Sequence, residues 1–148
     1  MVAASQIDIK QLCFDKALNN NLLRGFAMPL NVTIADDSAM SRKGIRRALP
    51  ADWDVVIHEA CNGKEALAAV DEGHADVLFL DLTMPEMDGF EVLTYLKNHH
   101  KKIVVIVISA DIQPQAQALV YQLGAFRFLQ KPLQAGQLHE VLHEMGLL

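Results

Sequence analysis

The stretch VLFLDLTMPEMDGF, residues 77–90, combines a short apolar run with an acidic residue directly behind it. Residues 77–80 are apolar, and Asp81 ends the run. A run of this length, bounded by polar and turn-forming residues, is typical of a buried strand. The Asp88-Gly89 pair and the apolar positions after it indicate that a helix begins there. The segment therefore predicts a strand, a polar loop and a helix, with one carboxylate where the strand ends.

The same arrangement of an apolar run followed by a polar side chain occurs at three other places in the chain. The polar residues behind these runs are Asp36-Asp37, Ser109 and Lys131. Helical stretches lie between the runs, and this alternation is typical of parallel βαβ units. We expect strands near residues 31–35, 54–59, 76–80, 103–108 and 126–130. Because functional groups of open parallel sheets gather beyond the carboxyl ends of the strands, the sequence predicts one crevice with three carboxylates, a hydroxyl and an ammonium. That set suits a hard divalent cation and a phosphoryl group.

Capping residues indicate where the first four of five expected helices begin, and apolar spacing indicates which residues several of them bury. Ser38, Asn62-Gly63, Asp88-Gly89 and Pro114 mark the starts of the first four, and Gly124 ends the fourth. The residues expected to be buried are Met40, Gly44, Ile45, Ala48 and Leu49 in the first helix, Ala116, Leu119, Val120 and Leu123 in the fourth, and Leu138, Val141, Leu142 and Met145 in the fifth.

Length, composition and charge narrow the class of protein. The 148 residues, 51% hydrophobic and 21% charged, fit one globular domain. A formal net charge of −5 argues against nucleic acid as the main partner. The sequence has neither an apolar run of about 20 residues that could span a membrane nor the pattern of a signal peptide. The two cysteines imply no disulfide framework. We therefore expect a cytoplasmic protein without membrane or nucleic-acid partners.

Five stretches together resemble the receiver domain of two-component response regulators, in particular the single-domain chemotaxis (CheY-like) type. They are residues 34–38, 59–67, 80–89, 108–110 and 124–132, and they keep the order and spacing of that family. The resemblance implies an α/β, doubly wound, flavodoxin-like fold with five helices and a five-stranded parallel sheet of order 2-1-3-4-5. We divide the chain into an N-terminal extension, residues 1–30, and a receiver domain, residues 31–148. Two alternatives stay open for the extension, a disordered appendage or a docking helix.

The resemblance also implies a function for the polar residues at the strand ends. Asp81 would accept a phosphoryl group from a sensor histidine kinase or a histidine phosphotransfer protein, so the chain would be a phosphoprotein of a phosphorelay rather than an enzyme. Lys131 and Ser109 would contact the phosphoryl oxygens, and the peptide bond between Lys131 and Pro132 would be cis. A Mg²⁺ ion would be held by Asp36, directly or through water, by Asp37 and Asp81, and by the backbone carbonyl of Thr83.

In this family the fourth helix, fifth strand and fifth helix form the face that binds the output partner. Phe128 occupies the position of the switch aromatic residue on that face. Because nothing follows the fifth helix, we expect a stand-alone protein that acts by binding an output partner. Four basic residues of the first helix lie near the site, in a region that contributes to kinase docking in the family; each alone is interpreted as part of a solvated face. They are Arg42, Lys43, Arg46 and Arg47.

The sequence argues against two other functions of the same architecture. An aspartate-nucleophile phosphatase needs a second Asp two residues after the nucleophile, where this chain has Thr83. A flavodoxin-like electron carrier needs a Ser/Thr/Gly-rich phosphate loop after the first strand, where Asp36-Asp37 would repel a phosphate.

A zinc metalloprotease motif, H-E-x-x-H, is present at residues 139–143. The apolar stripe of this helix places His139 and His143 on its flank, and too little chain follows for a downstream third ligand. We therefore interpret the two histidines as part of the polar face of an amphipathic helix.

Overall fold

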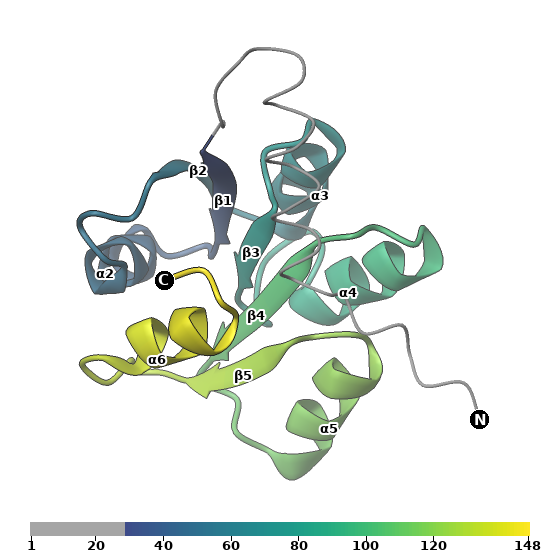
Figure 1. Ribbon diagram of the computed structural model, residues 1–148. Coiled ribbons are helices and arrows are strands. Elements are labelled where there is room, and N and C mark those ends of the chain that lie inside the picture. The colour runs from purple at the N-terminus through teal and green to yellow at the C-terminus, as the bar shows by residue number, and fades with distance from the viewer. Residues whose placement is uncertain (1–28) are drawn as a thin grey trace.

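The sheet consists of five parallel strands in the order β2-β1-β3-β4-β5. The computed structural model describes residues 29–148, and Figure 1 shows the sheet running through its centre. The strands are β1 (Leu30–Ala35), β2 (Val55–Ala60), β3 (Val77–Leu80), β4 (Val104–Ser109) and β5 (Arg127–Gln130). The predicted fold is confirmed, and every predicted strand end lies within one residue of the observed one. Most of the predicted extension lies outside the described residues, so the division at residue 31 stays a prediction.

Helices cover both faces of the sheet (Figure 1). They are α2 (Ala39–Ala48), α3 (Gly63–Asp71), α4 (Gly89–Asn98), α5 (Pro114–Gln122) and α6 (Gln137–Glu144). One apolar layer joins the sheet to α3, α4 and α5, and the other joins it to α2 and α6. Successive residues of β3 point to opposite layers, Leu78 to the first and Phe79 to the second. Burial on both faces explains why the central strands are continuously apolar. No helix in residues 29–148 is long and apolar enough to cross a membrane.

The helices begin where their capping residues predict. The side chain of Ser38 accepts a hydrogen bond from the Ser41 amide at the start of α2. Asn62 caps α3 in the same way, and Asp88 forms a reciprocal capping box at the start of α4. Pro114 occupies the first turn of α5, and Gly124 follows that helix with a positive φ of 103°. These caps fix the loops at the carboxyl ends of β1, β2 and β3.

Three residues expected to be buried are exposed instead. Met40 is 83% exposed and Leu119 is 40% exposed, and Gly44 is exposed as well. Met40 lies five residues before the buried Ile45, and five residues at about 100° each place the two on nearly opposite sides of a helix. Leu119 lies on the flank of α5, which packs over the edge of the sheet through the narrower stripe of Ala116 and Val120.

Two histidines form a stacked pair beside β1. The rings of His58 on β2 and His74 before β3 are parallel within 5°, with centroids 4.2 Å apart. His58 Nε2 lies 3.2 Å from the Asn31 amide oxygen, and Glu72 lies 3.4 Å from His74 Nδ1. Burial, and secondarily the neighbouring His74, lower the pKa of His58, whereas Glu72 opposes that shift.

At the β5 edge of the sheet, the side chain of Tyr121 accepts a hydrogen bond from one backbone N–H group. The Phe128 N–H of β5 donates a hydrogen bond to the phenolic oxygen of Tyr121 on α5, at 3.0 Å. Tyr121 is 46% exposed, and β5 pairs only with β4 among the described strands.

Candidate functional site

The backbone of the sheet places the polar residues at one edge. Each of three of them directly follows its strand and donates its N–H to the next strand, so the sheet extends by one residue at each position. The bonds run from Asp36 to Ala60 (3.0 Å), from Asp81 to Ala35 (2.9 Å) and from Lys131 to Ser109 (2.9 Å). The carboxyl ends of β1, β3 and β5, each hydrogen-bonded to a neighbouring strand, therefore fix the positions of these three residues.

Three carboxylates and one ammonium meet at this edge. Oxygen atoms of Asp36, Asp37 and Asp81 lie within 4.8 Å of one another. Asp36 is 1% exposed and Asp81 is 7% exposed, whereas Asp37 is open to solvent. The Lys131 ammonium lies 2.7 Å from Asp36 Oδ2 and 3.6 Å from Asp81 Oδ1. The structure thus brings together four of the residues that the sequence singled out.

The surroundings of Asp81 oppose its ionised form. Burial raises the pKa of this carboxyl group above its ordinary value, and repulsion from Asp36 adds to the effect. The Lys131 ammonium and the backbone N–H groups of Leu82 and Thr83 act in the other direction. The Leu82 N–H donates to Asp81 Oδ1 at 2.9 Å. Asp81 therefore combines restricted contact with water and a fixed orientation.

The other predicted site residues lie in the loops around the cluster. Ser109 is 1% exposed and ends β4, where its Oγ accepts a hydrogen bond from the Asp111 amide at 3.1 Å. Thr83 is exposed in the loop after β3. The Lys131–Pro132 peptide bond is cis, as the resemblance implied. Their roles in chemistry stay predictions.

Two glycines allow the loop after β3 to pack closely. A Cβ atom on Gly89 would lie 2.4 Å from the backbone oxygen of Asp81. A Cβ on Gly63 would lie 2.2 Å from the backbone oxygen of Met87, which accepts the Gly63 N–H at 3.1 Å. Only a hydrogen atom fits at either position, so both glycines maintain the backbone path next to Asp81.

The acidic cluster has the composition of a site for a hard divalent cation. All three candidate ligands are carboxylates, and one ammonium is too little positive charge to balance them. Two of the three are buried, and buried charges of one sign are unfavourable unless a cation compensates them. Mg²⁺ prefers oxygen ligands of this kind. Asp36, Asp37 and Asp81 therefore fit the cation that the sequence implied.

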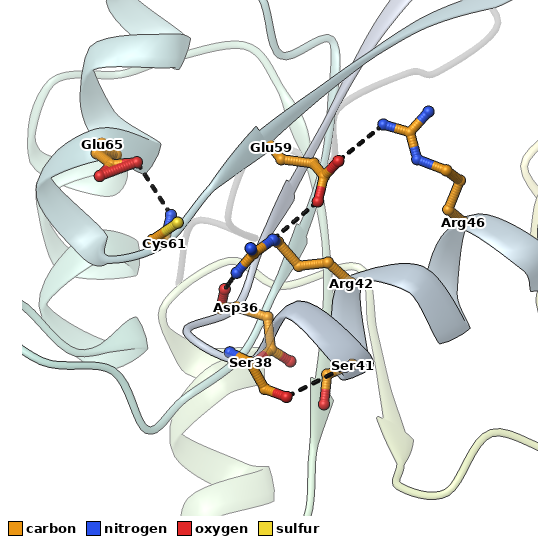
Figure 2. Close-up of polar contacts among 8 residues, drawn as sticks. All are labelled: Asp36, Ser38, Ser41, Arg42, Arg46, Glu59, Cys61 and Glu65. Atoms are coloured by element: carbon orange, nitrogen blue, oxygen red, sulfur yellow. Dashed lines mark hydrogen bonds and ion pairs between the residues drawn. The ribbon is translucent and has the colours of Figure 1, made fainter.

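Glu59 had no predicted role and Arg42 was expected on a solvated face, yet the two residues form a hydrogen-bonded pair behind the cluster. The Arg42 Nη1 atom donates to the backbone carbonyl of Asp36 at 2.7 Å, and its Nε donates to Glu59 Oε1 at 2.8 Å (Figure 2). Arg46 donates to the other Glu59 oxygen at 2.9 Å. The Arg42 side chain is 13% exposed, so it is not the solvated residue that we expected. The sequence offers no local signal for this pairing, because Arg42 and Glu59 are 17 residues apart.

The two histidines of the H-E-x-x-H motif are exposed on α6. The apolar residues of that helix, Leu138, Val141, Leu142 and Met145, are buried as expected.

A groove opens beside the cluster, between α2 and the loop that joins β5 to α6. Its volume is about 1070 Å³, and Lys131 lies in its wall. The α2 side contributes Ser41, Gly44, Ile45, Arg47 and Ala48, and the opposite side contributes Pro132, Leu133, Gln134, Ala135, Gly136 and His139. The groove thus connects an accessible surface with the ammonium of the site.

Comparison with known proteins agrees with this geometry. The family model of the response regulator receiver domain matches residues 32–143, and the chain belongs to that family. Over 117 residues the chain is 31% identical to the transcriptional regulatory protein BtsR of Salmonella typhi; the match covers 78% of this chain and 48% of that protein. The chain thus spans about half the length of that relative.

A shorter relative and a solved structure show the same likeness. The chain is 36% identical over 115 residues to the chemotaxis protein CheY of Listeria monocytogenes, with 78% of this chain and 97% of that protein covered. It also resembles a chain of the CheX-CheY-BeF3-Mg complex from Borrelia burgdorferi, with a TM-score of 0.71, 31% identity and coverage of 80% and 90%. The chain is a CheY-like receiver domain.

Proposed function

We propose that this chain is a stand-alone receiver that accepts a phosphoryl group on Asp81 and signals through phosphorylation-dependent binding to a partner. The observation that carries the proposal is the buried Asp81 carboxylate, with the Lys131 ammonium 3.6 Å away and two further carboxylates within 4.8 Å. The structure of a receiver in complex with BeF3 and Mg, to which this chain is similar, supports it.

The proposed reaction transfers a phosphoryl group from a histidine to an aspartate. An Asp81 carboxylate oxygen attacks the phosphorus of a phosphohistidine, the P–N bond breaks, and the histidine leaves with its electron pair. The product is an aspartyl acyl phosphate. Asp37, Asp81 and the Thr83 carbonyl would hold Mg²⁺, with Asp36 binding it directly or through water, and the bound ion would neutralise charge on the phosphoryl oxygens. Lys131 contacts one of these oxygens, and Ser109 donates its hydroxyl hydrogen to another.

The donor is a sensor histidine kinase or a histidine phosphotransfer protein. The groove between α2 and the β5–α6 loop supports this role, because it leads from the surface to Lys131. Its walls carry apolar groups and the exposed Arg47. A helix of the donor seated there would carry its phosphohistidine toward Asp81.

The output partner binds the face formed by α5, β5 and α6. Phe128 is half-buried on β5 and packs against the apolar layer beneath α5. Movement of Ser109 toward a phosphoryl oxygen changes the space available to the Phe128 ring, so the ring's position reports the state of Asp81. The two states then differ in their affinity for the partner.

We further propose a cytoplasmic signalling protein that uses neither nucleic acid nor a membrane as partner and that modifies no substrate other than itself. The net charge of −5 supports the exclusion of nucleic acid, since phosphate backbones favour basic surfaces. The CheY relative, which the match covers almost completely, supports an independent receiver.

The decisive experiment is phosphorylation by acetyl phosphate in the presence of Mg²⁺. Mass spectrometry should find one base-labile phosphate on Asp81. Asp81→Asn should abolish labelling, because an amide lacks the nucleophilic carboxylate. The exposed Asp52 provides a matched control, and Asp52→Asn should be labelled like the wild type. Wild-type labelling of Asp81→Asn, or full labelling in excess chelator, would refute the proposal.

A further inference from the structure

A guanidinium group joins three elements behind the acidic cluster. Arg42 belongs to α2, donates to the Asp36 carbonyl in the turn after β1, and donates to Glu59 near the end of β2. Figure 2 shows Arg42 between these two acceptors. Both hydrogen bonds are short, 2.7 and 2.8 Å, and the side chain is 13% exposed. Packing and a planar donor geometry therefore define the position of this group.

The Asp36 carbonyl is the backbone group that governs the direction of Asp37. The C=O of Asp36 and the N–H of Asp37 lie in one planar peptide unit. A hydrogen bond that fixes the Asp36 oxygen therefore also fixes the orientation of the peptide plane that leads into Asp37. The Arg42 contact is thus one peptide plane away from a candidate cation ligand.

The two neighbouring aspartates differ in how they are held. The Asp36 carboxylate accepts hydrogen bonds from the Ser38 N–H at 2.9 Å and from Lys131 at 2.7 Å. Within residues 29–148, no side chain or backbone amide donates to the Asp37 carboxylate. Asp37 is therefore positioned by its backbone alone. The guanidinium group of Arg42 holds that backbone together with two backbone N–H groups, that of Asp36, which donates to Ala60, and that of Ser38, which donates to the Asp36 carboxylate.

Glu59 supports the arginine from the other side. One of its oxygens accepts from Arg42 and the other from Arg46. The hydrogen bond from Arg42 is the main cause of the lowered pKa of Glu59. Glu59 therefore stays ionised at neutral pH, where it orients the Arg42 fork and balances its charge.

We propose that Arg42 is a positioning residue for the cation site: with Glu59 behind it, Arg42 holds the Asp36 carbonyl and thereby sets the direction of the Asp37 carboxylate and the affinity of the cluster for Mg²⁺. The inference shares with the proposed function the premise that the cluster binds Mg²⁺. It does not require that Asp81 be phosphorylated.

The test is calorimetric titration of the wild type and four variants with Mg²⁺ alone. Arg42→Met should weaken Mg²⁺ binding about tenfold, since groups that orient metal ligands contribute about 10- to 100-fold to affinity. Arg42→Lys should recover part of the loss through a single donor, and Glu59→Gln should cause a smaller loss. Arg46→Met is the matched control, because Arg46 contacts the same glutamate without a hydrogen bond to Asp36. Its dissociation constant should stay within twofold of wild type.

Two further measurements separate positioning from general stability. Urea unfolding without Mg²⁺ reports the stability of each variant, and a purely structural role would change it without changing the dissociation constant. Labelling by acetyl phosphate at increasing Mg²⁺ should shift to higher Mg²⁺ in Arg42→Met yet reach the wild-type plateau.

A dissociation constant for Arg42→Met within twofold of wild type would overturn the inference. If that variant does not fold, wild-type affinity in both Arg42→Lys and Glu59→Gln would overturn it. If Mg²⁺ binding is weakened in Arg42→Met but Asp81 is never labelled, the proposed function is refuted and the positioning role remains. Normal labelling of Asp81 together with an unchanged Mg²⁺ affinity in Arg42→Met would leave the proposed function and remove the positioning role. A wild type that binds no Mg²⁺ would refute both.

Discussion

Replacing Gly89 by alanine should destabilise the protein, whereas the same change at Gly44 should stabilise it. A Cβ on Gly89 would lie 2.4 Å from the Asp81 oxygen and 2.8 Å from Leu82 Cα, both backbone atoms. Ordinary contact begins at 3.4 Å, so the backbone must move by about 1 Å. Overpacking of this kind costs about 1–3 kcal/mol, and removing a glycine from a helix returns about 0.5–1 kcal/mol. The expected net loss of unfolding free energy is about 1–2 kcal/mol.

Gly44 provides the matched control because it lies inside α2 and an added Cβ would meet no neighbouring atom within 4 Å. Gly44→Ala should gain about 0.5–1 kcal/mol from helix propensity alone. Urea unfolding of both variants measures the two changes. Gly89→Ala should also slow labelling of Asp81 by acetyl phosphate, since a 1 Å displacement near a reacting group can cost about 100-fold. A Gly89→Ala variant with wild-type stability and labelling would show that the loop adapts freely.

Three other predictions concern the cation ligands, the phosphorylated state and pH. Asp37→Ala should weaken Mg²⁺ binding, measured by calorimetry, more than Asp36→Ala, because Asp36 already pairs with an ammonium; the opposite order would contradict the ligand assignment. Changing both Thr83 and Asp111 to alanine should alter hydrolysis of the labelled protein about tenfold, or roughly 1.4 kcal/mol of barrier, and decay within twofold of wild type after donor removal would exclude a role for them. The lowered pKa of His58 means that the unfolded chain binds its proton more readily. The contribution of His58 to stability should therefore be complete above the ordinary pKa of about 6.5 and decline as pH falls below it. Between pH 7.5 and 5.5 the urea midpoint should fall less in His58→Gln than in the wild type. An equal dependence of the midpoint on pH in both proteins would refute this.

Much of the fold and the acidic cluster could be predicted because both depend on local patterns. Runs of apolar residues fix where strands end, and the geometry of a parallel sheet then brings the residues after them to one edge. Asp36, Asp37, Asp81 and Lys131 meet for this reason. The three aspartates meet because β1 and β3 are adjacent in the order 2-1-3-4-5. Lys131 follows β5, which β4 separates from β3, and its long side chain brings the ammonium to Asp36 and Asp81.

The contacts of Arg42 could not be predicted in the same way. Arg42 and Glu59 are 17 residues apart, and the loop between them does not encode their register. The pairing of Ala35 with Ala60 in the sheet places Glu59 opposite the end of β1. The exposure of Met40 shows a related limit, because apolar spacing alone assigned it to a face that the helix geometry turns outward. The clearance around Gly89 depends on the path of a loop, which no periodic pattern specifies.

The hydrogen bond from Phe128 to Tyr121 has a consequence for the behaviour of the protein at high concentration. An open strand edge offers free N–H groups on which another molecule can add a strand, and such edges promote aggregation. The phenol of Tyr121 occupies one of these groups on β5. A neighbouring molecule would have to displace this hydroxyl before its own backbone could pair there. One side chain of the adjacent helix therefore opposes strand addition at this position of the β5 edge.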